Sequence, residues 1–347
     1  MTLRRVGTYD DISRAITHLP SLENRSPFAG SVDVSFDRDG RVCLVVVVAG
    51  RFDLPEPSAT RSPALRLSEP QEPPNFQDVF FGDPASSSLR REGQSAYTRP
   101  GTDIHLLGRA WAPRGRRCSD STVALSVGPC AVQARISGPR RYVRAALGVT
   151  ATAVEPLESV ELRYEHSVGG PTEPRNPVGC GIYAGTREAV DQPLPQIEDP
   201  RDRGAPIGFG PIARAWQPRL GYAGTYDQAW IDHRAPRWPE DLDLRFFQAA
   251  PPALVATPHL RGGEPVQVVG CHPDGPWRFT LPTHRLRARW LFTRAPARTT
   301  ELTLDAVEID AEAFVVTLIW RASVALAGPV FDHQVTFLDE MHPGEAA

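Results

Sequence analysis

The residues best suited to chemistry lie between Ala223 and Pro252, a stretch that holds acids, a histidine, arginines, two tryptophans and a Phe-Phe pair. Asp227 and His233 could act there as a carboxylate–histidine pair, which requires the two side chains to lie within hydrogen-bonding reach. Their spacing of six residues places them on different faces of one helix. We therefore interpret Asp227 as a helix-capping acid and His233 as a surface or packed histidine.

Other motifs that carry chemistry are missing from the chain. Its nine histidines are scattered and its five cysteines form no Cys-x-x-Cys pair. Neighbouring residues such as Asp232-His233 and Cys271-His272 point in different directions and make no metal site by themselves. There is no G-x-S-x-G elbow and no Walker loop, and the glycines of Gly179–Gly185 have the wrong spacing for a dinucleotide fingerprint. The sequence predicts a binding or scaffolding protein without catalytic residues, metal or cofactor.

Charge and hydropathy limit the partners that we expect. The net charge of −3, from 38 basic and 41 acidic residues, gives no general attraction to nucleic acid or to anionic membranes. Residues 90–103 and 138–144 place arginines beside a tyrosine, a pattern that could bind nucleic acid or sugar by stacking but equally describes an arginine-guarded strand edge. The N-terminus lacks the apolar core of a signal peptide, and no apolar run approaches the length of a membrane span. We expect a cytoplasmic protein with no nucleic-acid and no membrane partner.

Apolar patterning predicts a mainly β fold that must position these residues. Residues 31–52 form the clearest hairpin, with Asp39-Gly40 at the turn and the continuous apolar run Leu44–Val48 typical of a strand covered on both faces. Further strands or hairpins are predicted at residues 102–113, 122–136, 156–168, 264–282, 284–292 and 300–324. The chain has 35 prolines and 28 glycines, which do not suit helix interiors or central strands. We expect antiparallel, sandwich-like sheets with long Gly/Pro-rich ordered loops and few short helices.

Composition divides the chain into three segments. Residues 1–168 are predicted as an N-terminal β region and residues 221–347 as a helix followed by a C-terminal β region, with the alternative that the two share one core. Residues 169–220 connect them and contain 17 glycines and prolines. This connecting segment is either a linker or a loop ordered by packing, and its aromatic residues Tyr183, Phe209 and Trp216 favour packing.

The best helix candidate is TYDQAWIDHRA, residues 225–235. Thr225 and Gln228 have the spacing of a capping box, and Asp227 in the first turn suits the helix dipole. Tyr226 and Trp230 share the face that we expect to dock the helix. Before Pro236 the helix must end, after about three turns. Downstream, the Phe246-Phe247 pair is interpreted as packing.

A series of short motifs resembles one known family along nearly the whole chain. The stretches that carry the likeness are NRSPFA (24–29), SSLRRE (87–92), RPGTDIHLLGRAWAP (99–113), ELRYEHSVGG (161–170), RNPVGCG (175–181), GFGPIARAWQPRLGYAGTYDQAW (208–230), LDLRFFQAAPP (242–252) and LTLDAVEID (302–310). Their order and spacing resemble the adaptor or chaperone proteins of bacterial type VI secretion, first catalogued as a domain of unknown function and encoded beside effectors and PAAR-repeat proteins. The chain departs from the family where Ser167 and Val168 stand in place of an aromatic residue.

The resemblance implies a non-enzymatic protein that binds a cognate effector, stabilises it, and helps to place it on the PAAR-domain tip and VgrG spike of the secretion apparatus. It assigns no catalytic residues and no partner contacts. The motif residues are expected to be structural: Gly101, Thr102, Asp103, Asn176, Pro177, Gly179, Thr225, Tyr226, Asp227, Trp230, Arg245, Phe246, Phe247, Pro251 and Pro252.

Two alternatives to an adaptor stay open at this point. A β-rich, carbohydrate-active enzyme would have paired carboxylates at catalytic separation in a cleft. A carbohydrate-binding module would show a planar row of exposed aromatic side chains.

Overall fold

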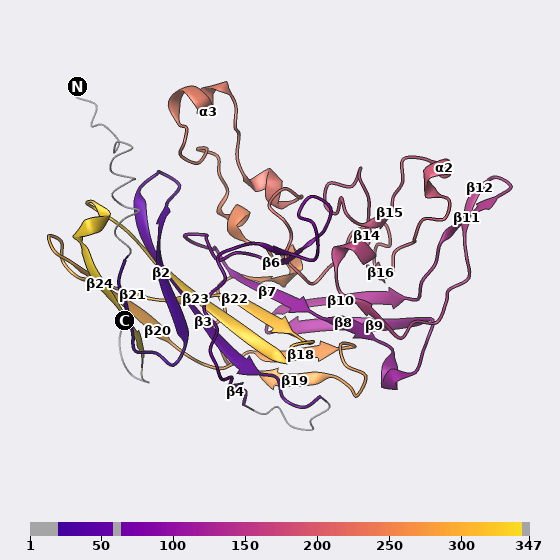
Figure 1. The fold of residues 1–347 in the computed structure, drawn as a ribbon, viewed down its shortest axis with the longest axis horizontal. Helices are drawn as coiled ribbons and strands as arrows, with labels where there is room; N and C mark the ends of the chain where they lie inside the picture. The colour runs from indigo at the N-terminus through magenta and orange to yellow at the C-terminus, as the bar shows by residue number, and fades with distance from the viewer. Residues whose placement is uncertain (1–19, 58–63, 342–347) are drawn as a thin grey trace.

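A computed structural model describes residues 20–57 and 64–341, and the protein is mainly β, as predicted. The largest sheet lies at the centre of Figure 1 and combines strands from both ends of the chain. Its order is β17 (Val255–Ala256), β7 (Thr102–Leu107), β22 (Thr303–Asp310), β23 (Val315–Ala325), β3 (Val42–Asp53) and β2 (Ala29–Phe36), and β4 (Arg66–Leu67) also pairs with β3. All neighbours are antiparallel except β22 and β7, which run parallel.

The central strand β3 confirms the interpretation of its apolar run. Leu44 and Val46 point into the main core, where Trp320 of β23 also lies. The alternate residues Val45 and Val47 lie in a smaller core that Phe76 and Tyr97 help to cover. Because successive side chains of a strand point to opposite faces, an uninterrupted apolar run is what a strand covered on both faces requires.

Two smaller sheets complete the core. One has the order β16 (Ile197–Glu198), β10 (Cys130–Ser137), β9 (Asp120–Val127), β18 (Pro265–Val269) and β19 (Trp277–Thr280). The other has the order β1 (Leu22–Asn24), β24 (His333–Glu340), β20 (Leu286–Phe292) and β21 (Arg298–Glu301). Buried residues of both, such as Leu125, Trp277 and Trp290, belong to the same hydrophobic cluster as Val46 of the largest sheet. The three sheets therefore share one core, and the segment boundaries at 168 and 220 stay a prediction.

The remaining elements are short. Four two-stranded ribbons pair β5 (Val79–Phe80) with β6 (Leu89–Arg91), β8 (Arg109–Trp111) with β13 (Ser159–Glu161), β11 (Tyr142–Ala145) with β12 (Gly148–Ala151), and β14 (Val168–Gly169) with β15 (Cys180–Gly181). The α-helices among the described residues are α2 (Thr186–Ala189) and α3 (Gln228–His233), and single 3-10 turns lie at Pro113–Gly115, Tyr164–His166, Arg219–Tyr222, Leu244–Phe247, Pro252–Leu254 and Val330–Asp332. In the part of the chain that the structure describes, no helix is long and apolar enough to cross a membrane.

Two predicted strands are broken in the structure. The stretch at 102–113 divides at Gly108, whose φ of 138° favours glycine and separates β7 from β8. The stretch at 156–168 forms β13, turns at Tyr164 and enters β14 only at its last residue, Val168. This turn packs Tyr164 edge-on against Trp216, with ring centroids 5.6 Å apart. The break in the alternating pattern thus coincides with a tertiary aromatic contact.

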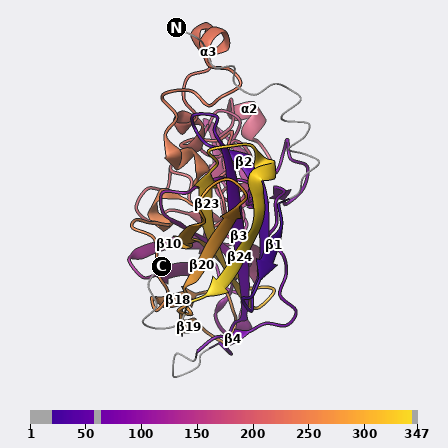
Figure 2. The same cartoon turned by 90° about the vertical axis from the view of Figure 1, so that its left-hand side faces the viewer.

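The Gly/Pro-rich connecting segment is ordered. Phe209 and Trp216 are buried, as expected of a loop held by packing, and Tyr183 is half-buried. The backbone N–H of Leu106 in β7 donates to the Phe209 carbonyl at 3.0 Å, so the segment is bonded to the largest sheet. Figure 2 shows α3 at the end of the molecule, beyond the sheets.

Candidate partner-binding arm and the ion cluster that supports it

The chain from Arg219 to Arg245, here called the arm, carries α3 away from the sheets (Figure 1). Asp227 caps α3, because its carboxylate accepts a hydrogen bond from the Trp230 backbone N–H at 2.9 Å. The predicted Thr225 cap is wrong: the Thr225 hydroxyl donates instead to Asp241 at 2.7 Å. The N–H groups of Arg234 and Ala235 both donate to the Trp230 carbonyl, which ends the helix after six residues instead of three turns.

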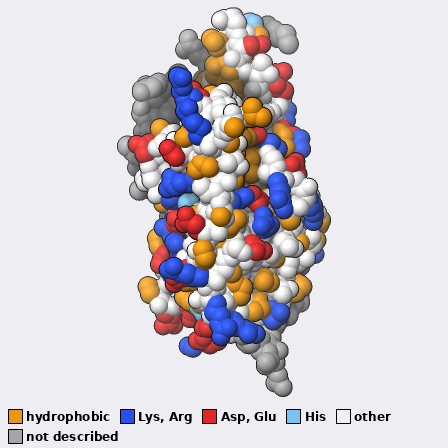
Figure 3. Space-filling model, turned by 90° about the vertical axis from the view of Figure 1, so that its right-hand side faces the viewer, with side chains coloured by type: hydrophobic (Ala, Val, Ile, Leu, Met, Phe, Trp, Pro, Cys, Tyr) orange, Lys and Arg blue, Asp and Glu red, His pale blue; other side chains and the backbone are white. Residues whose placement is uncertain are grey.

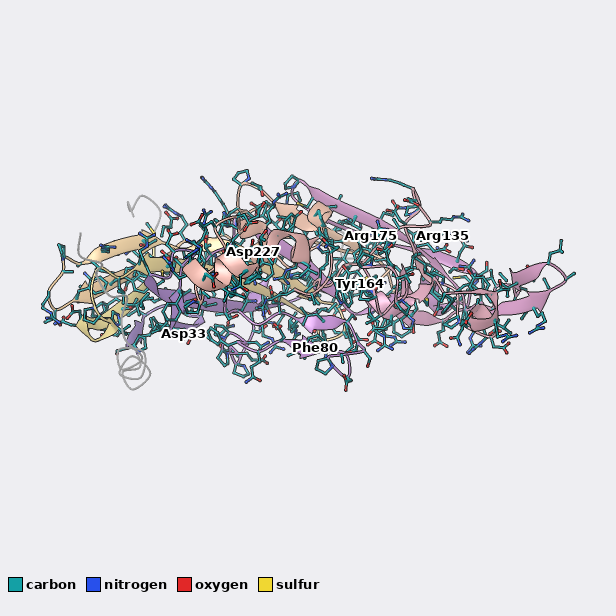
Figure 4. The ribbon with its side chains drawn as sticks, turned by 90° about the horizontal axis from the view of Figure 1, so that it is seen from above. Asp33, Phe80, Arg135, Tyr164, Arg175 and Asp227 are labelled. Atoms are coloured by element: carbon teal, nitrogen blue, oxygen red, sulfur yellow. The ribbon has the colours of Figure 1, made fainter. Side chains whose placement is uncertain are left out.

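The aromatic pair of the arm forms as predicted but lies outside the sheets. The Tyr226 and Trp230 rings meet edge-to-face at 4.7 Å, and the Trp230 indole N–H donates to the Arg237 carbonyl at 2.9 Å. Trp230 is half-buried, whereas Tyr226 is 50% exposed and Ile231 is 56% exposed. The expected docking face of the helix is therefore only partly covered. Figure 4 looks down on this side and labels Asp227 at the start of α3.

The arm also rests on the turn between β2 and β3. Arg234 donates to the Arg38 carbonyl at 3.2 Å and lies 3.6 Å from the Asp39 carboxylate. Gly40 at this turn has a φ of 77°, and a Cβ atom there would come within 2.6 Å of the Arg237 side chain. A glycine is needed at this position for both reasons, and so the predicted Asp39-Gly40 turn also supports the arm.

The base of the arm is a small aromatic cluster. Phe246 and Phe247 are buried, as side chains that serve packing are, and they contact Trp238 with ring centroids 5.8 and 5.5 Å apart. Tyr97 packs edge-on against Phe247. Arg245 stays at the surface, where it pairs with the carboxylate of Asp243 at 2.6 Å and lies over the Tyr222 ring.

A buried ion cluster joins the two ends of the arm to the largest sheet. Arg219 donates to the carbonyls of Phe246 and Ile212 and to the carboxylate of Glu92 at 2.5 Å. The other Glu92 oxygen accepts from Arg99 at 2.9 Å, and Arg99 lies 3.4 Å from the Asp103 carboxylate. The side chains of Glu92, Arg99, Asp103 and Arg219 are almost completely buried. The pattern of residues 90–103 predicts either a stacking surface or an exposed strand edge. The structure differs, because Arg99 is an interior residue.

A second buried pair lies beside the first. Arg321 of β23 donates to the carboxylate of Asp305 at 2.5 Å, to the backbone carbonyls of Gln94 and Ala96, and to the side-chain oxygen of Gln94. Its partners Gln94 and Ala96 lie in the segment between Glu92 and Arg99. This segment is therefore fixed from both sides by arginine, whose planar group can donate several hydrogen bonds at once.

Burial and charge shift several pKa values in this cluster. Burial raises the pKa of Asp103 to about 6, although Arg99 opposes the shift. Burial, together with Arg99, lowers the pKa of His105 to about 3. For Glu92 burial acts upward, but Arg219, Arg99 and Arg214 outweigh it and lower its pKa. Asp103 would suit a general acid by its pKa alone, yet it has no exposed surface and accepts a hydrogen bond from the Ala249 N–H.

The motif residues of β7 hold the chain where it meets the cluster. The Thr102 hydroxyl donates to the Leu304 carbonyl at 2.5 Å and accepts from the Leu260 N–H at 2.9 Å. A Cβ atom on Gly101 would come within 2.5 Å of the Ala256 carbonyl oxygen, so only glycine fits there.

The motif residues Asn176, Pro177 and Gly179 belong to a separate cluster. The Asn176 amide donates to the carbonyls of Tyr164 and Val168, and a Cβ atom on Gly179 would come within 2.3 Å of that amide. Pro177 is half-buried in this loop. Elsewhere, Pro251 and Pro252 start the 3-10 turn that buries Leu254. The contacts of Asn176 and Gly179 thus hold the connecting loop, and the two prolines lie just beyond the base of the arm.

Surface depressions lie away from the ion cluster. Two open depressions share Pro139, His166 and Gln196 in their linings, and neither is lined by a residue of the cluster. Among residues 20–57 and 64–341, no group of three or more His, Cys, Asp or Glu side chains could hold a metal ion. The five cysteines are unpaired thiols.

These features define a mainly β protein that presents a short helical arm on a buried ion cluster. Comparison with protein families then places it. Residues 39–321, more than half of the chain, match the family described as "Uncharacterized protein conserved in bacteria (DUF2169)", and the protein belongs to that family. The match includes the arm, the aromatic base and the ion cluster. No curated protein and no solved structure matches the chain.

Proposed function

We propose that this protein is a non-enzymatic, cytoplasmic adaptor or chaperone that binds a type VI secretion effector and promotes its loading onto the PAAR/VgrG spike. The motif resemblance suggests this class, and the arm is the structural feature that supports it. Leu220, Tyr226 and Ile231 are each at least half exposed on a segment that is otherwise held by hydrogen bonds and ion pairs.

Exposed apolar groups on a rigid support favour binding for two reasons. Burying such side chains against a partner removes apolar surface from water, which is worth roughly 25 cal/mol per Å². A segment that is already ordered loses little conformational entropy when it binds. Aromatic side chains such as Tyr226 are among those enriched at interface hot spots.

The experiment is to purify the protein together with the effector encoded beside its gene and to separate the mixture by size-exclusion chromatography. We expect one co-eluting complex with the wild-type protein and a weaker complex with Ile231→Asp. Leu67→Asp is the matched control, because Leu67 is an exposed leucine on β4, outside the arm. Separate elution of the wild-type protein and effector would refute the proposed function. Equal binding by Ile231→Asp would refute only the role of the arm.

The same structure gives the carbohydrate alternatives no specific support. Substrate cannot reach Asp103, whose raised pKa would suit a general acid, because the surrounding chain seals it. The exposed aromatic residues Phe36, Tyr226 and Phe314 come from three separate places in the chain: the end of β2, the arm, and the turn between β22 and β23. We therefore propose the adaptor function alone.

A further inference from the structure

The β11–β12 hairpin extends from the end of the molecule that lies at the right in Figures 1 and 4. Its strands pair only with each other in a four-residue antiparallel register. Ala146 and Leu147 form the turn, and Gly148 supplies a φ of 123°. Leu147 is 102% exposed, which makes it the most exposed large hydrophobic side chain among the described residues.

The base of this hairpin is firmly held. Arg140 pairs with the carboxylate of Glu198 at 2.8 Å. The backbone of Tyr142 exchanges hydrogen bonds with residues 191 and 192, and its ring packs edge-on against Tyr183 at 6.0 Å. The Tyr183 hydroxyl donates to the Pro193 carbonyl at 2.7 Å. An ordered base of this kind fixes the direction of the tip before any partner binds.

Leucine at the tip does not serve the hairpin itself. Two-residue hairpin turns favour Asn-Gly or Asp-Gly, because these residues accept the backbone angles of the turn. Leu147 has no buried surface, so it adds nothing to the hydrophobic core. A polar residue would suit the turn at least as well, and it would not expose an apolar side chain to water.

The charge of the hairpin is one-sided. From Arg140 to Val154 the chain contains no acidic residue. The side chain of Arg144, next to the tip, is exposed and makes no hydrogen bond or ion pair with the residues that the structure describes. Figure 3 looks onto this end of the molecule and shows basic, acidic and hydrophobic side chains interspersed on it. An apolar tip with a basic flank is complementary to an apolar socket bordered by carboxylates.

We propose that the β11–β12 hairpin is a second docking site, which inserts Leu147 into an apolar, acid-rimmed socket of a partner protein while Arg144 pairs with the rim. A single leucine is too small an anchor for a membrane surface. The one aromatic residue of the hairpin, Tyr142, is half-buried and packs edge-on against Tyr183, so the tip presents no aromatic platform for bases. A protein partner is therefore the occupant that the chemistry fits, and the proposal rests on the adaptor function.

The test uses the effector and the PAAR-domain protein encoded beside the gene, each purified and titrated with full-length protein by calorimetry. We expect Leu147→Asp and Arg144→Glu to weaken binding of one of them by about tenfold or more, since burial of a leucine side chain is worth that much. High salt should weaken wild-type binding and should affect Arg144→Glu less. Leu67→Asp and Arg278→Glu, at exposed positions on β4 and β19, are the controls.

Three outcomes separate the proposals. If the hairpin variants bind both proteins as tightly as wild type, the hairpin site is refuted and the adaptor function stands. If the wild-type protein binds neither, both proposals fall. If Leu147→Asp loses binding but salt has no effect on the wild type, the acidic rim is refuted. Thermal unfolding of Leu147→Asp should match wild type, because Leu147 buries nothing.

Discussion

Replacing Arg219 by methionine tests whether the buried ion cluster holds the arm to the protein. Methionine keeps much of the length of arginine but removes its charge and all its donors. The substitution leaves the carbonyls of Phe246 and Ile212 without these donors and leaves Glu92 with Arg99 as its remaining buried partner. Breaking a buried ion pair from one side costs about 3–5 kcal/mol, because a buried charge loses its compensation. We expect a loss of unfolding free energy in this range for Arg219→Met.

Arg214 provides a matched control for this substitution. Its guanidinium also lies near Glu92, at 3.3 Å, but its side chain is 39% exposed. Solvent screens such a pair, so Arg214→Met should cost less than about 1 kcal/mol. In urea titrations followed by circular dichroism, we expect the midpoint of Arg219→Met to fall by about 1–2 M with an unchanged slope. Equal midpoints for Arg219→Met and Arg214→Met would refute the reasoning.

A double variant separates charge balance from packing. Glu92→Gln combined with Arg219→Met removes one charge of each sign and leaves Arg99 beside Asp103, 3.4 Å from its carboxylate. We expect the double variant to be more stable than Arg219→Met alone, because the unbalanced carboxylate is gone. Additive losses from the two single substitutions would show that the pair is not coupled.

Three further predictions concern the arm and the titrating residues. Trp230→Ala should lower the unfolding free energy by about 2 kcal/mol in urea titrations, less than a fully buried tryptophan would, because the ring is half-buried. Asp227→Asn should change stability and effector binding little, since asparagine caps helices as well as aspartate does, and a large loss in either assay would contradict the cap. The raised pKa of Asp103 means that folding takes up a proton there, so the contribution of Asp103 to stability falls as the pH rises from about 4 to 6. The lowered pKa of His105 means that folding releases a proton there, so the contribution of His105 to stability increases as the pH rises from about 3 to 6.5. Asp103→Asn should therefore gain stability relative to wild type as pH rises from 4 to 6, by about 1.4 kcal/mol per pH unit, and a constant difference across that range would contradict the raised pKa.

Local patterns in the sequence predict the strands well and the contacts between distant segments poorly. The strands β3 and β23 each contain a mostly apolar run, and such runs need only their own residues to be recognised. The parallel pairing of β22 with β7 joins residues about 200 positions apart, and no local signal encodes it. Thr225 and Asp227 are both good capping residues, and the choice between them depends on Asp241, a residue that lies beyond the helix in the chain.

The ion cluster was beyond sequence reasoning for the same reason. Arg99 and Asp103 are four positions apart, a spacing that permits an ion pair, but a single sequence does not show whether such a pair is exposed or buried. Arg219 reaches Glu92 across more than a hundred residues, and Arg321 reaches Gln94 across more than two hundred. The motif residues Thr102 and Asp103 lie at the cluster. Glu92 is the last residue of the motif SSLRRE, which indicates the family but not the position of Glu92 in the fold. A repeated co-occurrence of these residues in related sequences is the signal that could reveal the cluster.

A buried ion cluster is a poor way to gain stability, because well-packed apolar residues of similar volume are often as stable or more so. Charged groups instead fix the orientation of the segments that they join. Arg219 binds a carbonyl at the base of the arm and a carboxylate of the neighbouring segment at the same time, and its planar donors accept few other arrangements. If the double variant at Glu92 and Arg219 recovers stability but binds the effector more weakly than the equally stable wild type, the cluster orients the arm. If binding recovers together with stability, the cluster is needed only for folding, and the exposed residues of α3 are sufficient for recognition.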